Sequence, residues 1–438
     1  MRLRLLFIMS LLTLLLTVTF KAWPGTAVPF SADYVLGFLF VTPLVGALSA
    51  WTLTGFKGAG QLMTDGGRSL WALVLLLFVA WAWLSQSWAL MRGSRDAIAQ
   101  NAALTYALVA AFALLLVCCP PPRRQLNAAL VAALLVSAAV GIAQSAAQSE
   151  LGLHLLGEQR DLDPARSGVS VVQSGEARLL RAYGLLPHPN IMGGVLAAGA
   201  AWLLAHSAEP RGRGRRIGAL AVVFLALCLT FSRGAWIALA VSSAFIVAWH
   251  AWRGKLRMLA LPLLACSIVG LGFAATYHPF LLARANVTGE ALEQRSVAER
   301  VIYNQIAFEA IQSAPLQGVG AGNFAWYAAR YLRDHPEYDL RGTNVHQVAL
   351  LILAELGLIG FALFGLIVTL PLLRGGWLLW QHGVDAQRLG ALAGALILAL
   401  VGVVDHYPAA IPQALLLWWG LLALAMQPHS SDYASAGA

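Results

Sequence analysis

The chain has 438 residues, of which 59% are hydrophobic and 11% are charged, and its formal net charge is +9. Soluble domains contain about 25% charged residues, so this composition excludes a soluble globular protein and predicts a multi-span membrane protein. The four cysteines lie inside apolar runs. This placement argues against a disulfide framework or a cysteine zinc site.

Apolar segments of transmembrane length recur along the chain. A spanning helix needs about 20 apolar residues, and about twelve segments approach that length. The first follows Arg2 and Arg4, and we expect it to be a retained span rather than a cleaved signal peptide. The sequence therefore predicts an all-α integral membrane protein that forms a single polytopic domain over residues 1–438. The predicted spans lie at about 5–20, 34–55, 69–90, 100–119, 126–147, 190–206, 216–231, 234–250, 256–277, 347–371, 388–404 and 411–427.

The Lys and Arg residues of the short loops set the predicted orientation. Short cytoplasmic loops carry an excess of these residues. The bias is satisfied when the N-terminus is cytoplasmic, because the basic run from Arg211 to Arg216 then faces the cytoplasm. An even number of spans also leaves the C-terminus there. Two long loops, residues 148–189 and 278–346, are then extracytoplasmic.

Both long loops are rich in arginine, against the usual bias for outer segments. Positive charge kept on that side indicates an anionic partner. The arginines concerned are Arg160, Arg166, Arg178 and Arg181 in the first loop and Arg284, Arg295, Arg300, Arg330, Arg333 and Arg341 in the second.

Short helices are expected inside the second loop. Ser296 and Glu299 have capping-box spacing, which predicts a helix over about 296–313 with Arg300 and Asn304 on one face. A glycine-rich turn follows at 316–324. A second short helix is predicted over about 324–333.

Several short motifs occur in an order that is informative about family. They are Arg181-Ala182-Tyr183-Gly184 leading into His188-Pro189-Asn190, then Phe231-Ser232-Arg233-Gly234, then Glu299-Arg300 with Pro315-Leu316-Gln317-Gly318-Val319-Gly320, and last His346-Gln347 before Gly357 and Gly360. Over about residues 178–408, this order resembles the O-antigen ligase family, membrane glycosyltransferases of the C-type architecture that share a core with O-antigen polymerases and oligosaccharide-to-protein transferases.

The resemblance implies a reaction and its partners. Ligases of the family join a polysaccharide carried on undecaprenyl pyrophosphate to a sugar of the lipid A core, at the periplasmic face of the bacterial inner membrane. The implied partners are this lipid-linked donor, the lipid A-core acceptor and membrane lipids, without nucleic acid. No cofactor and no metal are expected, because the lipid pyrophosphate is itself the leaving group.

The chemistry assigns roles to four residues that fall on the predicted outer side. Histidine has a pKa near working pH, so His346 is expected to be the general base that orients or deprotonates the acceptor hydroxyl. Arginine binds phosphate oxygens through a planar fork and stays charged, so Arg181, Arg300 and Arg233 are expected to bind the pyrophosphate.

Five further polar residues are candidates for lining the same cavity, and plainer roles fit them as well. His188 and Asn190 also suit a turn around Pro189, and Asp405 also suits a helix end. Arg233, too, could simply anchor a helix at the headgroups. Glu355, inside the tenth predicted span, is interpreted as a structural polar contact. The cavity candidates are His188, Asn190, Asn304, Gln347 and Asp405.

Other functions remain open on the residues alone. An O-antigen polymerase or a protein O-oligosaccharyltransferase would use the same donor and differ only in the acceptor. The basic outer loops favour the phosphorylated lipopolysaccharide core as acceptor. A lipid-linked glycan or proton-coupled transporter is the alternative of another class, and it is disfavoured because the sequence shows no obvious repeat of its halves.

Overall fold

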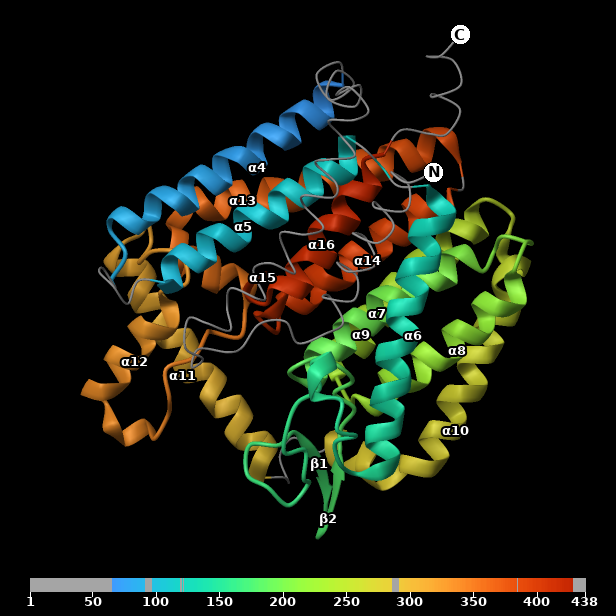
Figure 1. Ribbon diagram of the computed structural model, residues 1–438, viewed down its shortest axis with the longest axis horizontal. Helices are drawn as coiled ribbons and strands as arrows, with labels where there is room; N and C mark the ends of the chain where they lie inside the picture. The colour runs from blue at the N-terminus through green and yellow to red at the C-terminus, as the bar shows by residue number, and fades with distance from the viewer. Residues whose placement is uncertain are drawn as a thin grey trace.

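The computed structural model describes residues 65–90, 97–118, 120, 122–285, 291–383 and 385–427. Helices dominate these residues, and the strands among them form a single antiparallel hairpin (Figure 1). The first two predicted spans, at about 5–20 and 34–55, lie outside the described residues.

Within these ranges, six helices are long and apolar enough to cross a membrane. Two shorter apolar helices, α14 (Ala386–Gly402) and α16 (Pro412–Ala425), accompany them. The protein is therefore a helical membrane protein, and the twelve-span layout stays a prediction. The six are α4 (Gly66–Leu84), α5 (Ala97–Cys118), α6 (Arg123–Ala147), α9 (Arg233–Trp252), α10 (Ala260–Ala285) and α13 (Val348–His382).

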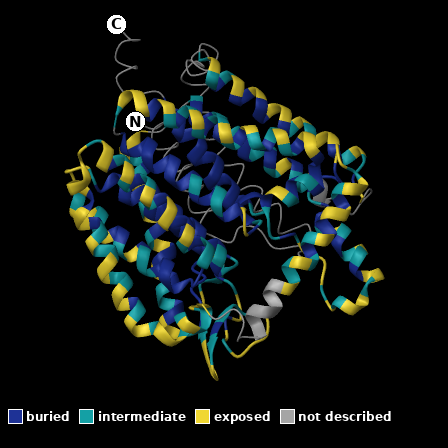
Figure 2. Cartoon of the chain, turned by 180° about the vertical axis from the view of Figure 1, so that it is seen from behind, coloured by how far each residue is buried: buried dark blue, intermediate teal, exposed yellow. Residues whose placement is uncertain are grey.

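The centre of the bundle is α7 (Pro189–His206), which packs against α14 and against α8 (Arg213–Leu229). Every residue of α7 except Asn190 is buried, and Figure 2 shows buried residues concentrated in the middle of the bundle. Gly194 allows a close approach, because a Cβ there would lie 1.9 Å from the Tyr407 hydroxyl. Tyr407 begins the short helix α15 (Tyr407–Ala410). The start of α7 is thereby fixed beside the residues that precede α15.

Two helices extend beyond their predicted ends, at 277 and 371. Helix α10 continues to Ala285 across a non-helical residue, Tyr277, and Pro279 lies at the start of the continuation, where its missing N–H costs little. Helix α13 continues through Pro371 to His382 and has its break earlier, at Gly357. Proline is tolerated in such a helix because neighbouring groups satisfy the freed backbone.

The second long loop contains α11 (Ala291–Ser313) and α12 (Phe324–Asp334), the latter where the second helix was expected. Helix α11 begins at Ala291, so the prediction that Ser296 caps it is wrong. Its buried face consists of Tyr303, Ile306, Ala307 and Ala310, which pack with α12 and the start of α13 in a small core of their own.

A buried carboxylate joins α12 to α13. Glu355 accepts hydrogen bonds from the backbone N–H groups of Gly322 at 2.9 Å and Phe324 at 3.2 Å. The backbone of the glycine-rich turn also pairs with this part of α13, since Val319 N–H donates to the Ala354 carbonyl and Gly320 N–H to that of Glu355. Glu355 therefore has the structural contact that the sequence favoured.

The first long loop contains a hairpin that was not expected from the sequence. Strand β1 (Val171–Ser174) pairs with β2 (Ala177–Leu180), with Val171 opposite Leu180. In Figure 1 the hairpin lies at the same end of the molecule as the start of α11. Strand β2 ends directly before Arg181 and so positions that residue beside the bundle.

Candidate functional site

His346 lies at the junction between the second long loop and α13. Val345 before it is fully buried, and Gln347 after it is the N-cap of α13, so the chain holds His346 on both sides. Its Nδ1 is 3.8 Å from Asp405 Oδ1, and its ring centroid is 5.3 Å from that of His406 and 6.4 Å from that of Tyr303 on α11. His346 therefore faces Tyr303, which precedes it in the chain, and Asp405 and His406, which follow it after α13 and α14.

Asp405 lies in the turn between α14 and α15, and it is buried. Its Oδ1 accepts the His406 backbone N–H at 2.8 Å, and its Oδ2 accepts from Asn190 Nδ2 at 3.2 Å. Burial opposes ionisation, but His346, His406 and His188 face the carboxylate and hold the pKa of Asp405 well below its usual range. The carboxylate is consequently ionised at neutral pH.

Asn190 connects this carboxylate to Arg181. Arg181 Nη2 donates to Asn190 Oδ1 at 2.6 Å, and Arg181 Nε donates to the Thr230 carbonyl at 2.7 Å. Burial lowers the pKa of Arg181 to about 10, so the guanidinium remains charged at neutral pH. One chain of contacts thus runs from Arg181 through Asn190 and Asp405 to His346.

His188 supports this chain of contacts. It is the N-cap of α7, and its Nδ1 accepts the Asn190 backbone N–H at 3.1 Å. Its Nε2 is 3.0 Å from Ser170 Oγ. Burial, with the nearby charge of Arg181, lowers the pKa of His188 to about 3. The ring is therefore neutral, and both of its nitrogens are used in holding Asn190 and the loop before β1.

The turn between α8 and α9 presents carbonyl groups to two arginines. Phe231 in this turn has φ of 47°, a left-handed conformation that is costly for a bulky residue. The fully buried Phe231 ring packs against Trp236, Phe273 and Tyr277, which fixes the strained backbone. The Phe231 carbonyl accepts from Arg284 Nε at 3.3 Å, beside the Thr230 carbonyl that holds Arg181.

Four arginines lie close enough near this turn for their charges to interact, and we call Arg181, Arg233, Arg284 and Arg300 the arginine cluster. Arg233 Nη1 donates to the Arg284 carbonyl at 2.9 Å. The positive charges of Arg181, Arg233 and Arg300 all act on the Arg284 guanidinium. Mutual repulsion of this kind is relieved by an anion. The cluster unites the three arginines that the sequence selected and adds a fourth.

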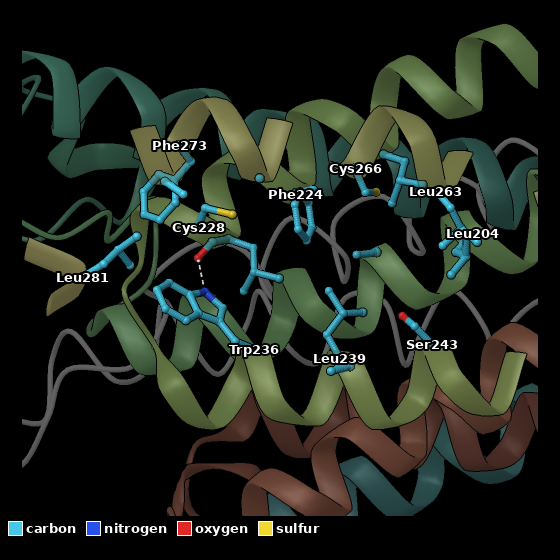
Figure 3. A pocket seen from close by; sticks show the side chains of 16 residues that line it. Leu204, Phe224, Cys228, Trp236, Leu239, Ser243, Leu263, Cys266, Phe273 and Leu281 are labelled. Atoms are coloured by element: carbon cyan, nitrogen blue, oxygen red, sulfur yellow. Dashed lines mark hydrogen bonds between the residues drawn. The ribbon is translucent and has the colours of Figure 1, made fainter. Parts of the chain in front are cut away.

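An apolar cavity of about 450 Å³ lies next to the cluster within the bundle. Trp236, Leu239 and Ser243 of α9 line one side, and residues of α8 and α10 line the other (Figure 3). Its lining includes Leu281, three residues before Arg284, and Trp236, which contacts Phe231. The cavity therefore lies beside the α8–α9 turn, whose carbonyl groups hold two arginines of the cluster.

Comparison with known families bears on this arrangement. Residues 218–365 match the family model described as O-antigen ligase. This segment of the chain is similar to the O-antigen ligase family. No curated protein matches the chain. The matched range runs from α8 into α13 and includes Arg233, Arg284, Arg300 and His346.

The match has coarse functional consequences. An O-antigen ligase domain implies a glycosyltransferase-like enzyme with ligase or polymerase-type activity, in the biosynthesis of lipopolysaccharide. It also implies a lipid-linked glycan donor and a lipid acceptor in the membrane. Arg181, His188, Asn190 and Asp405 lie outside the matched range, yet they contact one another directly beside His346.

Two residues of this site were not selected from the sequence. Arg284 was counted only among the loop arginines, because α10 was expected to end before it. His406 directly follows Asp405 but was not among the cavity candidates, and burial lowers its pKa to about 4. Conversely, two residues selected from the sequence, Asn304 and Gln347, are not part of the chain of contacts from Arg181 to His346. Asn304 lies on α11 with its Oδ1 buried, and Gln347 caps α13.

Proposed function

We propose that the chain is an O-antigen ligase that transfers a polysaccharide from undecaprenyl pyrophosphate to a sugar hydroxyl of the lipid A core at the periplasmic face of the inner membrane. The observation that carries this proposal is the contact chain from the arginine cluster to His346. A group that binds an anion and a group that accepts a proton are thereby held in one site, which is what glycosyl transfer from a lipid pyrophosphate requires.

The arginine cluster is suited to the leaving group. When the bond between the anomeric carbon and the phosphate oxygen breaks, negative charge develops on the pyrophosphate. Preorganised cations aimed at developing charge lower the barrier, each by about 3–4 kcal/mol in favourable sites. Arg284 and Arg181 are held by carbonyl groups of one turn, so their guanidinium groups are positioned before the donor arrives.

His346 is suited to the acceptor. Its Nδ1 faces the ionised Asp405, which favours the tautomer with the proton on Nδ1 and leaves the Nε2 lone pair available. Nε2 would accept the proton of the acceptor hydroxyl while the hydroxyl oxygen bonds to the anomeric carbon. Asp405 is then a positioning residue that stabilises the imidazolium, as the carboxylate does in a Ser-His-Asp arrangement.

The apolar cavity is suited to the lipid part of the donor. It lies in the membrane-spanning part of the bundle, and its lining residue Trp236 packs against Phe231, whose carbonyl holds Arg284. A polyprenyl chain seated there would place its pyrophosphate among the arginines. The lipid chain, the pyrophosphate and the sugar would then follow one another along the molecule.

Reconstitution with purified components tests the proposal. The protein in detergent would be incubated with undecaprenyl-pyrophosphate glycan and with lipid A core, and the products would be separated by gel electrophoresis. Glycan attached to the core is the expected product. A lengthened lipid-linked glycan without modified core would instead indicate a polymerase, and movement of the donor across proteoliposomes without any transfer would indicate a transporter.

A further inference from the structure

Three potential metal ligands converge beside the arginine cluster. His346, Asp405 and His406 each offer a ligand atom, and these atoms all lie within 4.8 Å of one another. Asp405 Oδ1 is 3.8 Å from His346 Nδ1 and 3.4 Å from His406 Nδ1. Two imidazoles and a carboxylate form a donor set typical of zinc sites.

The Nδ1 atoms of His346 and His406 have the same unusual environment. Both Nδ1 atoms are buried, and within the described part of the chain neither has a hydrogen-bond partner. Buried polar atoms are normally hydrogen-bonded, so such a pair calls for an explanation. The nearby His188 provides a contrast, because hydrogen-bond partners lie at both of its ring nitrogens. An ion bound through both Nδ1 atoms, with the ring proton of each histidine on Nε2, would satisfy both atoms at once.

The spacing suits a small tetrahedral ion. Zinc binds nitrogen and oxygen ligands at about 2.0–2.1 Å, so neighbouring ligand atoms of a tetrahedral site lie about 3.3–3.4 Å apart. The separation from His406 Nδ1 to Asp405 Oδ1 already has this value, and that from His346 Nδ1 to Asp405 Oδ1 is 3.8 Å. Asn190 holds the other oxygen of Asp405, as outer hydrogen bonds hold metal-binding carboxylates.

We propose that His346 Nδ1, Asp405 Oδ1 and His406 Nδ1 form an inhibitory binding site for Zn²⁺. The side chain of His346 is 30% exposed, which leaves the ion a route into the site. A neutral imidazole that binds zinc through Nδ1 carries its proton on Nε2 and has no lone pair left there for the acceptor proton. The inhibitory consequence rests on the proposed role of His346, whereas the binding itself rests on the geometry alone.

A zinc titration of the purified protein tests the binding. The protein would carry an affinity tag without histidine, would be stripped with a chelator and dialysed, and would be titrated with ZnCl₂ by calorimetry. A single ion bound per chain is the expected result. Absence of saturable binding, or binding that survives replacement of the proposed ligands, would overturn the site.

Three variants assign the ligands. His406→Gln and Asp405→Asn should each weaken zinc binding at least about tenfold, because each removes a ligand from a three-ligand site. His278→Gln is the matched control, since His278 is exposed on α10 and does not belong to this group of ligands, and zinc binding by this variant should equal that of the wild type. Equal weakening in all three variants would refute the assignment.

X-ray absorption at the zinc edge gives a readout on the wild type that does not depend on how the variants fold. The expected spectrum has two imidazole nitrogens and at least one oxygen at about 2.0–2.1 Å. A sulfur ligand, or oxygen ligands without imidazole, would contradict the proposed site.

The inhibitory step is measured separately. Glycan transfer by chelator-treated protein tests the proposed function, and addition of Zn²⁺ should then abolish that transfer at the concentration at which the site fills. Transfer that continues unchanged with the site filled would overturn the inhibition and would leave the ligase function intact. Absence of transfer before zinc is added would count against the ligase function and not against the metal site.

Discussion

Two buried carboxylates in this protein differ in what surrounds them. Glu355 accepts hydrogen bonds from the backbone N–H groups of Gly322 and Phe324, which belong to a turn that the carboxylate holds in place. Asp405 instead faces two histidine rings and is linked through Asn190 to Arg181. A carboxylate bonded to backbone is a structural tie, whereas one that faces titratable side chains can influence a reaction. The two regions should therefore respond differently to substitution.

The largest expected effect concerns the arginine cluster. In the proposed function, replacing Arg284 with Gln removes a cation that stabilises the leaving group, and transfer should slow by about 10²–10³-fold. Initial rates of glycan transfer to lipid A core would measure this. Arg333→Gln is the control, because Arg333 is exposed on α12 and outside the arginine cluster. Comparable losses in both variants would show that positive charge acts generally and not at the cluster.

A smaller effect on rate is expected at Asp405. Asp405→Asn keeps the side chain's shape but removes the charge that orients and supports His346, and transfer should fall at least about tenfold. The loss should appear in the turnover number, with little change in the donor concentration at half-maximal rate. A variant with unchanged turnover but weakened donor binding would assign Asp405 to the binding of the donor.

Glu355 should show the opposite pattern. In Glu355→Gln one carboxylate oxygen becomes an NH₂ donor that faces a backbone N–H, which costs about 1–3 kcal/mol of stability. Thermal unfolding in detergent should begin at a lower temperature, while the transfer rate per folded molecule stays close to that of the wild type. A large loss of rate in fully folded protein would show that Glu355 takes part in the reaction.

The smallest expected effect is a dependence of stability on pH. The pKa values of His188 and His406 are lowered to about 3 and about 4 by burial, against about 6.5 in an unfolded chain. Below about pH 6.5 the unfolded state therefore binds protons that the folded state does not, and stability falls as the pH drops toward 4. The unfolding temperature should decrease over this range, and His406→Gln should flatten the decrease. An equally steep decrease in that variant would contradict the pKa assigned to His406.

Much of the helical pattern could be predicted from the sequence, because long apolar runs leave few alternatives in a membrane. The described helices α7, α8, α9, α14 and α16 lie where spans were predicted. The predicted ends of α10 and α13 were wrong, because Pro279 and Pro371 were interpreted as helix stops. In a bundle, neighbouring groups can satisfy the backbone groups that a proline leaves free. The hairpin β1–β2 was missed because its strands are four residues long.

The site could be predicted only as a set of separate residues. Motif order selected Arg181, Arg233, Arg300 and His346, but it could not show that Asn190 bridges Arg181 and Asp405. That contact depends on the close approach of Gly194 and Tyr407, residues more than two hundred positions apart. Arg284 enters the cluster because α10 extends past its expected end, and the strained Phe231 turn that holds it has no glycine to mark it.

The central claim is that His346 accepts the acceptor proton in a site where the arginine cluster holds the donor. The most direct test compares donor binding and transfer for the His346→Ala variant, using radiolabelled undecaprenyl-pyrophosphate glycan. We predict that donor binding remains at the wild-type level while transfer falls by about 10²–10⁴-fold, the usual contribution of a general base. Undiminished transfer would contradict the claim, and so would a loss of donor binding that accounts for the whole loss of transfer.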